Sequence, residues 1–523
     1  MHRRMPAWEK GDAGMTQKRR RLGLAGLIIL FLLAAFSLLR FLPFPQGLSA
    51  GLSAPAPSAA LLAAAESLDS IEIDARFDPD SRTLTLRQLL HLTHPGGEPR
   101  DEIILRAYPN AFQQQDTSPI AIEEWYDIAY PHGFSMGALS VSSLQGSHAG
   151  EPAQSLHRRY LDAAKTTLQI TLPFLWEPQS ALTLDISYTL YLPQAVGRFG
   201  LSEGIWTLGN TFLIPALYEN GRYRTDPYEP LGDPFLSDCA NYTLRLSLPS
   251  KYACAASAYG IVSAAAEEGR NLYTFQGYAL RDFALCLSEN FHRVQSLEGE
   301  VLISAYATDK KTAERMLTYA KQALSCFSSR YGAYPYPSLS LAEAHFPIEG
   351  AAYPGLILIN SPELNKESAE WLIAGLTARQ WWSIAVGIDP INQPWQQEAL
   401  SEYCLLDYAE DYYGPAQRET LTFSRIETAQ RITIPGSVTP GSPLFYFESQ
   451  SQYLHVVRHR GAALFCALNE ALEHRLDDFL RAYYDKYRFS RASREDLEAL
   501  LKTFSGEDWS PLFVDYLDTY TVL

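Results

Sequence analysis

The first half of the chain shows a two-residue period. Apolar side chains alternate with polar ones from Leu182 to Leu192, from Tyr242 to Leu248 and from Leu168 to Leu172. Such alternation is typical of half-buried antiparallel strands, which turn one face to a core and the other to water. The pattern predicts a β-rich region over residues 70–296, with long loops such as residues 130–150.

The period changes after about residue 297. One more strand is expected at residues 301–305, and from Ala313 to Phe327 the apolar residues recur at helical spacing. We expect this helix to end near Tyr331-Gly332, before a Tyr-Pro-Tyr-Pro stretch. From residue 367 onward most segments have a helical pattern. The chain as a whole is therefore predicted to be of the α+β class.

One segment, residues 22–42, has the apolar length of a membrane span. Its first 18 residues carry no charge, and the whole approaches the roughly 20 residues that a spanning helix needs. Four basic residues, Lys18 to Arg21, precede it. By the positive-inside rule we expect a single-pass anchor, with residues 1–21 as a cytoplasmic tail and the body outside the cytoplasm. A cleaved signal peptide and a buried soluble helix remain the alternatives. Residues 43–69, rich in Ala, Ser and Pro, are expected to be a linker.

Composition narrows the function classes. The 523 residues are 47% apolar and 20% charged, which permits a large core and excludes global disorder. Lys+Arg 43 against Asp+Glu 59 gives a net charge of −16, so general binding of nucleic acid is not expected. The six cysteines form no C-x-x-C, which excludes a cysteine zinc ribbon and a disulfide scaffold. The sequence has no phosphate-binding glycine loop and no G-x-S-x-G, so nucleotide and serine-hydrolase functions lack support.

Three stretches in order carry a family resemblance. They are Gly232-Asp233-Pro234-Phe235, then residues 330–337 with residues 350–357, then Gln380-Trp381-Trp382 followed by Glu398 and Glu402-Tyr403. Together they resemble the aminopeptidase-N family of zinc metallopeptidases, which includes leukotriene-A hydrolase. The resemblance covers roughly residue 70 to the C-terminus. It implies a sandwich-like β domain followed by a thermolysin-like domain over residues 297–523, and we expect no third, helical domain after it.

The family's zinc site is degenerate in this sequence. The chemistry needs H-E-x-x-H on a helix, because two histidines at i and i+4 bind zinc and the glutamate acts on the attacking water. Aligned on the tryptophan pair, these positions read Gly375, Leu376 and Arg379. Only Glu398 fits the family's third ligand, with eighteen residues between it and Arg379.

The family's other catalytic positions are also changed. The glutamate that grips the free amino group of the substrate falls on Ala352. The tyrosine that stabilises the oxyanion falls on Arg458, although a shifted register would use Tyr453 instead. Among the matched positions, Gly350 and Tyr353 are expected to remain beside the cleft together with Arg379 and Glu398.

The remaining donors are too few for a metal. Zinc in proteins takes three or four protein ligands, mostly imidazole or thiolate, and one carboxylate cannot replace them. Arg379 would also place a fixed positive charge where a dication should lie. We therefore expect no metal or other cofactor and no peptidase activity. We further expect Arg379 and Glu398 to form an ion pair at the vacated position; the alternative is that both point elsewhere on polar helix faces.

Histidines at three places in the sequence are candidate metal ligands. His455 and His459 are four residues apart on a probable helix, but without an acidic partner at suitable spacing we expect an ordinary polar face. His91 and His94 should point to opposite faces of one strand. His345 is expected to be a loop or edge residue.

These observations favour one function over two rivals. The first hypothesis is a membrane-anchored homologue of zinc aminopeptidases that has lost its chemistry, and whose cleft binds a peptide as an added strand or binds a protein partner. The second is an active zinc metallopeptidase with displaced ligands. The third is a structural component of an envelope complex, with the cleft filled by side chains.

Overall fold

The computed structural model describes most of the chain after residue 51; the described residues are 52–120, 123–148, 150–432, 434 and 437–519. The predicted cytoplasmic tail and membrane anchor lie outside them. Within the described ranges, no helix combines the length and apolarity that crossing a membrane requires.

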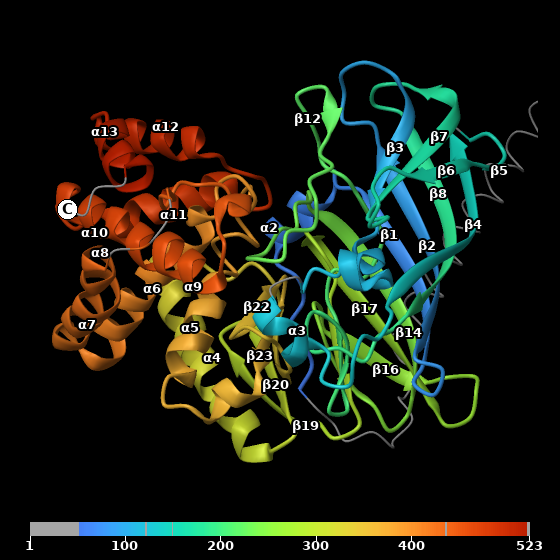
Figure 1. Ribbon diagram of the computed structural model, residues 1–523, viewed down its shortest axis with the longest axis horizontal. Helices are drawn as coiled ribbons and strands as arrows, with labels where there is room; N and C mark the ends of the chain where they lie inside the picture. The colour runs from blue at the N-terminus through green and yellow to red at the C-terminus, as the bar shows by residue number, and fades with distance from the viewer. Residues whose placement is uncertain (1–51, 121–122, 149, 433, 435–436, 520–523) are drawn as a thin grey trace, which may run out of the picture. The chain divides into compact units, whose positions relative to one another are not determined.

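The largest sheet has eight strands in the order β16-β17-β14-β1-β2-β8-β4-β5 (Figure 1). The strands are β1 Ser70–Asp78, β2 Thr83–Thr93, β4 Ala138–His148, β5 Gln154–Ser155, β8 Ala181–Tyr191, β14 Ala240–Pro249, β16 Gly260–Ala264 and β17 Arg270–Leu280. Strands β8 and β14 alternate buried and half-buried side chains, as their sequences predict. Neighbouring strands are antiparallel except β1 and β14, which run parallel, so the expectation of a purely antiparallel region was wrong for this pair.

Two four-stranded sheets and a short hairpin complete the β-rich region. Their strands are β9 Phe199–Ser202, β10 Ile205–Leu208, β15 Ala253–Ala256 and β18 Leu285–Ser288 in one sheet; β3 Arg100–Arg106, β6 His157–Tyr160, β7 Thr167–Trp176 and β11 Ile214–Pro215 in the other; and β12 Tyr218–Glu219 with β13 Arg222–Tyr223 in the hairpin. Short helical turns lie between them at η2 Tyr108–Gln113, η3 Gln115–Thr117 and α3 Glu123–Ala129.

Two sequence expectations in this region were wrong. Strand β4 occupies part of the expected loop at residues 130–150. Its serines and glycine have weak strand propensity, and the strand forms because it pairs with β8 along its length. The end of the expected linker is helix α2, Ala59–Ala65, because alanine is the best helix former, Ser58 caps the N-terminus and Leu61 is buried.

The second region is built on a mixed five-stranded sheet. The order is β19 His292–Glu298, β20 Val301–Ala307, β21 Ser338–Ala344, β23 Leu356–Asn360 and β22 Gly350–Tyr353. Strands β20, β21 and β23 are parallel, and β19 and β22 are antiparallel edges. Because β19 pairs with β20, the strand joins this sheet although it begins before residue 297.

Helix α4, Lys310–Tyr331, packs on β19 and β20 and has the expected end. Asp309 caps its N-terminus, and Gly332 after its last turn has a φ of 116°, which favours glycine. The helices that follow are η4 Ser361–Asn365, α5 Ala369–Ala378, α6 Trp395–Tyr413, α7 Pro415–Leu421, η5 Thr422–Glu427, α8 Thr428–Arg431, η6 Leu444–Tyr446, α9 Gln450–Tyr453, η7 Leu454–Arg460, α10 Gly461–Ala471, α11 Leu476–Tyr487, α12 Arg494–Ser505, α13 Ser510–Phe513 and η8 Val514–Asp518. The predicted helical region is thus confirmed.

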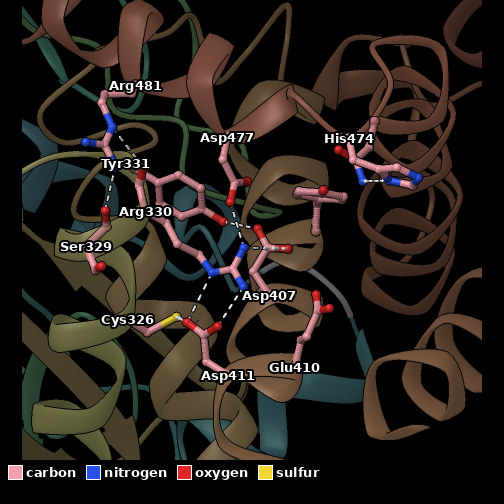
Figure 2. Close-up of polar contacts among 12 residues, drawn as sticks. Cys326, Ser329, Arg330, Tyr331, Asp407, Glu410, Asp411, His474, Asp477 and Arg481 are labelled. Carbon is pink, nitrogen blue, oxygen red and sulfur yellow. Dashed lines mark hydrogen bonds and ion pairs between the residues drawn. The ribbon is translucent and has the colours of Figure 1, made fainter. Parts of the chain in front are cut away.

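A cluster of charged side chains fixes α6 against its neighbours (Figure 2). Arg330 of α4 donates to Asp411 of α6 and to Asp477 of α11, each at 2.6 Å. Tyr331 donates to Asp407, which is 1% exposed. Asp407 is the buried member of the cluster and needs its partners, so these contacts hold α6, the helix that carries Glu398, against α4 and α11.

Candidate functional site

Helices α5 and α6 bring the degenerate positions together. Helix α5 ends at Ala378, and Arg379 follows as its C-cap with helical backbone angles. Gly375, Leu376 and Arg379 line one cavity between α5 and α6. They therefore share one face, as i and i+4 spacing predicts.

Arg379 and Glu398 form the predicted ion pair. The Nη2 atom of Arg379 lies 2.7 Å from each carboxylate oxygen of Glu398. One nitrogen therefore bridges both oxygens, rather than two nitrogens pairing with two oxygens. Arg379 is 6% exposed and Glu398 2%, so the pair is shielded from solvent.

The sequence did not predict a second carboxylate on Arg379. Asp233 accepts from Arg379 Nη1 at 2.8 Å and from Gln397 at 2.8 Å, and Arg198 also pairs with Asp233. Asp233 belongs to the Gly-Asp-Pro-Phe stretch that carries the family resemblance, but no role followed from that. Arg379 thus connects the β-rich region to α6.

Arg458 and Tyr453 both reach the same carboxylate. Arg458 Nε donates to Glu398 at 2.9 Å, and the hydroxyl of Tyr453 donates to it at 3.3 Å. Arg458 also donates to Glu349 at 3.0 Å. Both candidates for the family's tyrosine position therefore lie at the site, and Glu349, which the sequence did not indicate, joins it.

The resulting ion-pair network contains three guanidinium groups and three carboxylates: Arg198, Arg379, Arg458, Asp233, Glu349 and Glu398. Burial alone would raise the pKa of Glu398, but Arg379 and Arg458 outweigh it and hold that pKa below its usual value. The pKa of Asp233 is likewise lowered, because Arg198 and Arg379 outweigh the effect of its burial. Both carboxylates are therefore ionised and fully paired.

Three cavities meet at Arg379. The largest, which we call the cleft, encloses about 760 Å³ including its open part, and Gly350 and Glu398 line it. The second, of about 530 Å³, lies along Gly375 on α5. The third, of about 620 Å³, lies beyond Asp233, and Ala352 and Tyr353 line that one instead.

Tyr353 therefore does not face Glu398. It is 3% exposed, its hydroxyl donates to Asn210 at 3.2 Å, and Arg198 donates to it at 3.3 Å. It lies on the far side of Asp233 from the cleft.

The donors at this site do not fit zinc. Glycine and leucine offer no ligand atom, a guanidinium repels a dication, and both oxygens of Glu398 already accept from arginine. Across the described ranges, no group of three or more His, Cys, Asp or Glu side chains is arranged to hold a metal ion. No step through a metal follows from these residues.

The histidines differ in part from expectation. His459 does have an acidic neighbour, since its Nδ1 lies 3.3 Å from Glu402 of α6, so the premise that no acid accompanies the pair was wrong. The acid comes from another helix, which spacing along one helix cannot reveal. His94 is fully buried and His91 half-buried, as opposite strand faces predict. His345 follows β21 and lies 3.8 Å from Glu203.

Comparison with solved structures adds the fold relationship. An M1 zinc metallopeptidase from Deinococcus radiodurans is 17% identical, with a TM-score of 0.59, over 86% of this chain and 93% of that one. A glutamate-to-alanine mutant of a two-domain M1 zinc metallopeptidase bound to L-arginine is 17% identical, with a TM-score of 0.60, over 87% and 94%. A mutant of the Deinococcus enzyme bound to a Tyr-Ser-Ala substrate is 16% identical, with a TM-score of 0.59, over 87% and 94%.

This chain has the fold of the M1 zinc metallopeptidases. No family model and no curated protein matches its sequence. The fold expected from the three sequence stretches is therefore supported by structural similarity. A sequence identity of 16–17% supports a shared fold but does not extend to a shared activity.

Proposed function

We propose that the chain is a membrane-anchored, exported relative of the M1 zinc metallopeptidases that has no peptidase activity and binds a peptide in its cleft. One observation carries this proposal: the guanidinium of Arg379 stands between two buried carboxylates, Asp233 and Glu398. The one carboxylate at a family ligand position is thereby committed to arginine.

The side chains present support the proposed absence of activity. Leu376 at the position of the general base cannot accept a proton, and Gly375 cannot bind a metal. Losing the base together with the metal removes several powers of ten in rate. The second hypothesis, an active enzyme with displaced ligands, lacks a set of donors in the described ranges.

Peptide binding is supported by the edge of the mixed sheet. Strand β22 is the last strand of its sheet, and among the described strands its one partner is β23. Gly350, its first residue, lines the cleft of about 760 Å³. A free strand edge beside a cleft can add a peptide as a further strand. One structure of the same fold holds a Tyr-Ser-Ala tripeptide, which makes that peptide the natural first probe.

Three measurements on the purified full-length chain test the proposal together: its zinc content, its hydrolysis of Tyr-Ser-Ala and its binding of Tyr-Ser-Ala. We expect far less than one zinc per chain, no release of tyrosine above a heat-denatured control, and saturable binding of the intact tripeptide. Stoichiometric zinc with cleavage that a chelator abolishes would establish the active enzyme instead. Failure to bind any peptide would leave the structural-component hypothesis.

The membrane anchor needs a separate experiment, because residues 22–42 lie outside the described ranges. A basic cluster followed by an apolar segment supports the anchor. We expect the full-length chain to remain in the membrane pellet after an alkaline wash, with the body accessible to protease from outside. Release by the wash, or a mature chain that begins after residue 42, would contradict the anchor.

A further inference from the structure

The cavity beside α5, which we call the side chamber, is lined by Gly375. It encloses about 530 Å³ including its open part, and Arg379, Arg458 and Glu349 line both it and the cleft. A Cβ atom built at Gly375 would have a methyl group of Leu405 as its nearest neighbour, at 3.7 Å, which is an ordinary contact distance. Atoms of a ligand can therefore occupy the space beside Gly375.

A buried hydroxyl in the side chamber has no partner. Ser401 of α6 is 5% exposed and lines the chamber. Within the part of the chain that the structure describes, its Oγ makes no hydrogen bond. Buried polar groups are nearly always hydrogen-bonded, because an unpaired one loses its hydration without compensation. The hydroxyl therefore has hydrogen-bonding capacity that no described residue uses.

Two guanidinium groups in the same chamber have unused donors. Arg425 donates hydrogen bonds from Nε and Nη2 to Glu402. Arg458 donates from Nε to Glu398 and from Nη1 to Glu349. The hydrogen bonds of the described residues use neither Nη1 of Arg425 nor Nη2 of Arg458. Guanidinium N–H groups favour carboxylate and phosphate oxygens over neutral acceptors.

The charged side chains around the chamber are balanced in sign. Its wall carries three arginines and three glutamates: Arg379, Arg425, Arg458, Glu349, Glu363 and Glu402. Among these glutamates, Glu349 is the easiest to displace, because its side chain is 48% exposed while it pairs with Arg458. A ligand carboxylate can take its place on Arg458.

We infer that the side chamber binds a carboxylate of the peptide, between Arg425, Arg458 and the hydroxyl of Ser401. This inference rests on the proposed function, since the peptide reaches the chamber through the cleft. In the family, a glutamate binds the free amino group of the substrate, and Ala352 at that position offers no carboxylate. The side chamber instead recognises the opposite charge, a carboxylate of the peptide. The carboxylate comes from the C-terminus of the peptide or from an acidic side chain.

Four probes distinguish these outcomes by calorimetry on the full-length chain: trialanine, trialanine amide, N-acetyl-trialanine, and N-acetyl-Ala-Asp-Ala amide. We expect trialanine and its acetylated form to bind within about threefold of each other, and the amide at least about tenfold more weakly. Binding of the aspartyl peptide equal to that of trialanine would support the same chamber with a side-chain carboxylate. Equal binding of trialanine and its amide would overturn the inference and keep the proposed function. Binding of none would overturn both.

Two variants separate recognition from folding. Ser401→Ala should weaken trialanine binding at least about fivefold while the melting temperature stays equal or rises, because an unpaired buried hydroxyl is removed. Glu349→Gln should strengthen binding of trialanine but not of its amide. Ser329→Ala, on the exposed face of α4, is the matched control and should change neither. Unchanged trialanine binding by Ser401→Ala would overturn the role of the chamber.

Discussion

The Nη2 atom of Arg379 lies 2.7 Å from both carboxylate oxygens of Glu398. Its Nη1 atom donates at 2.8 Å to Asp233, which lies 146 residues away in sequence. The buried cation at one family ligand position is thus paired with the carboxylate at another, and with a second carboxylate from the β-rich region. An ion-pair network therefore occupies the positions that match the family's metal ligands, and it ties two regions of the chain together.

Arg379 should contribute strongly to stability. Arg379→Met leaves Asp233 and Glu398 buried with fewer donors, and we expect a loss of about 3–5 kcal/mol in the free energy of unfolding. Urea unfolding followed by tryptophan fluorescence measures the change. The control Arg87→Met breaks an ion pair with Asp185 whose arginine is 55% exposed, and should cost far less, because solvent screens exposed ion pairs. Equal effects of the two variants would contradict a buried clamp.

Ser383 should be a site of local backbone strain. It follows the tryptophan pair with a φ of 137°, a region that favours glycine. We expect Ser383→Gly to raise the free energy of unfolding by up to about 1 kcal/mol, because the strain is relieved. Ser329→Gly, in the last turn of α4, should instead lower it by a few tenths of a kcal/mol. Thermal unfolding of both variants tests the opposite signs, and destabilisation by Ser383→Gly would contradict the strain.

Asp282 should make stability fall as pH rises. Its side chain is 6% exposed, and burial, partly offset by hydrogen bonds from Phe283 and Asn210, raises its pKa from 3.8 to about 6. The folded state therefore holds a proton that the unfolded state has lost, so this group's contribution is complete below about pH 4 and is lost as pH rises through about 6.

Asp282→Asn removes that titration. The stability of the variant relative to the native chain should increase by on the order of 2–3 kcal/mol between pH 4 and pH 8. Any cost of the amide against Asn210 is independent of pH and shifts the whole curve equally. Urea unfolding across this range measures the difference, and a constant offset between the two proteins would refute the raised pKa.

Three substitutions should rebuild the metal site. Gly375→His has room, since a Cβ there meets nothing within 3.7 Å, and Leu376→Glu with Arg379→His completes the family pattern beside Glu398. We expect the triple variant to bind about one zinc per chain, measured by metal analysis after dialysis. Adding Glu398→Ala should abolish the binding. A folded triple variant without zinc would show that the alignment of these positions is wrong.

The sequence alone determined the local structure and the pairing of Arg379 with Glu398. Strand and helix periods are local properties, so β8, β14 and α4 follow from residues adjacent in the chain. The family-like spacing placed Arg379 and Glu398 on facing positions of consecutive helices, which is why their contact was predictable.

Only the tertiary structure decided what surrounds that pair. Asp233 reaches Arg379 across 146 residues, and Arg458 reaches Glu398 across 60. Strand β4 forms against β8 despite its weak strand propensity. Contacts of this kind depend on how distant segments pack, and no period or spacing in one segment encodes them. The same reason explains why the unpaired hydroxyl of Ser401 became visible only in the folded chain.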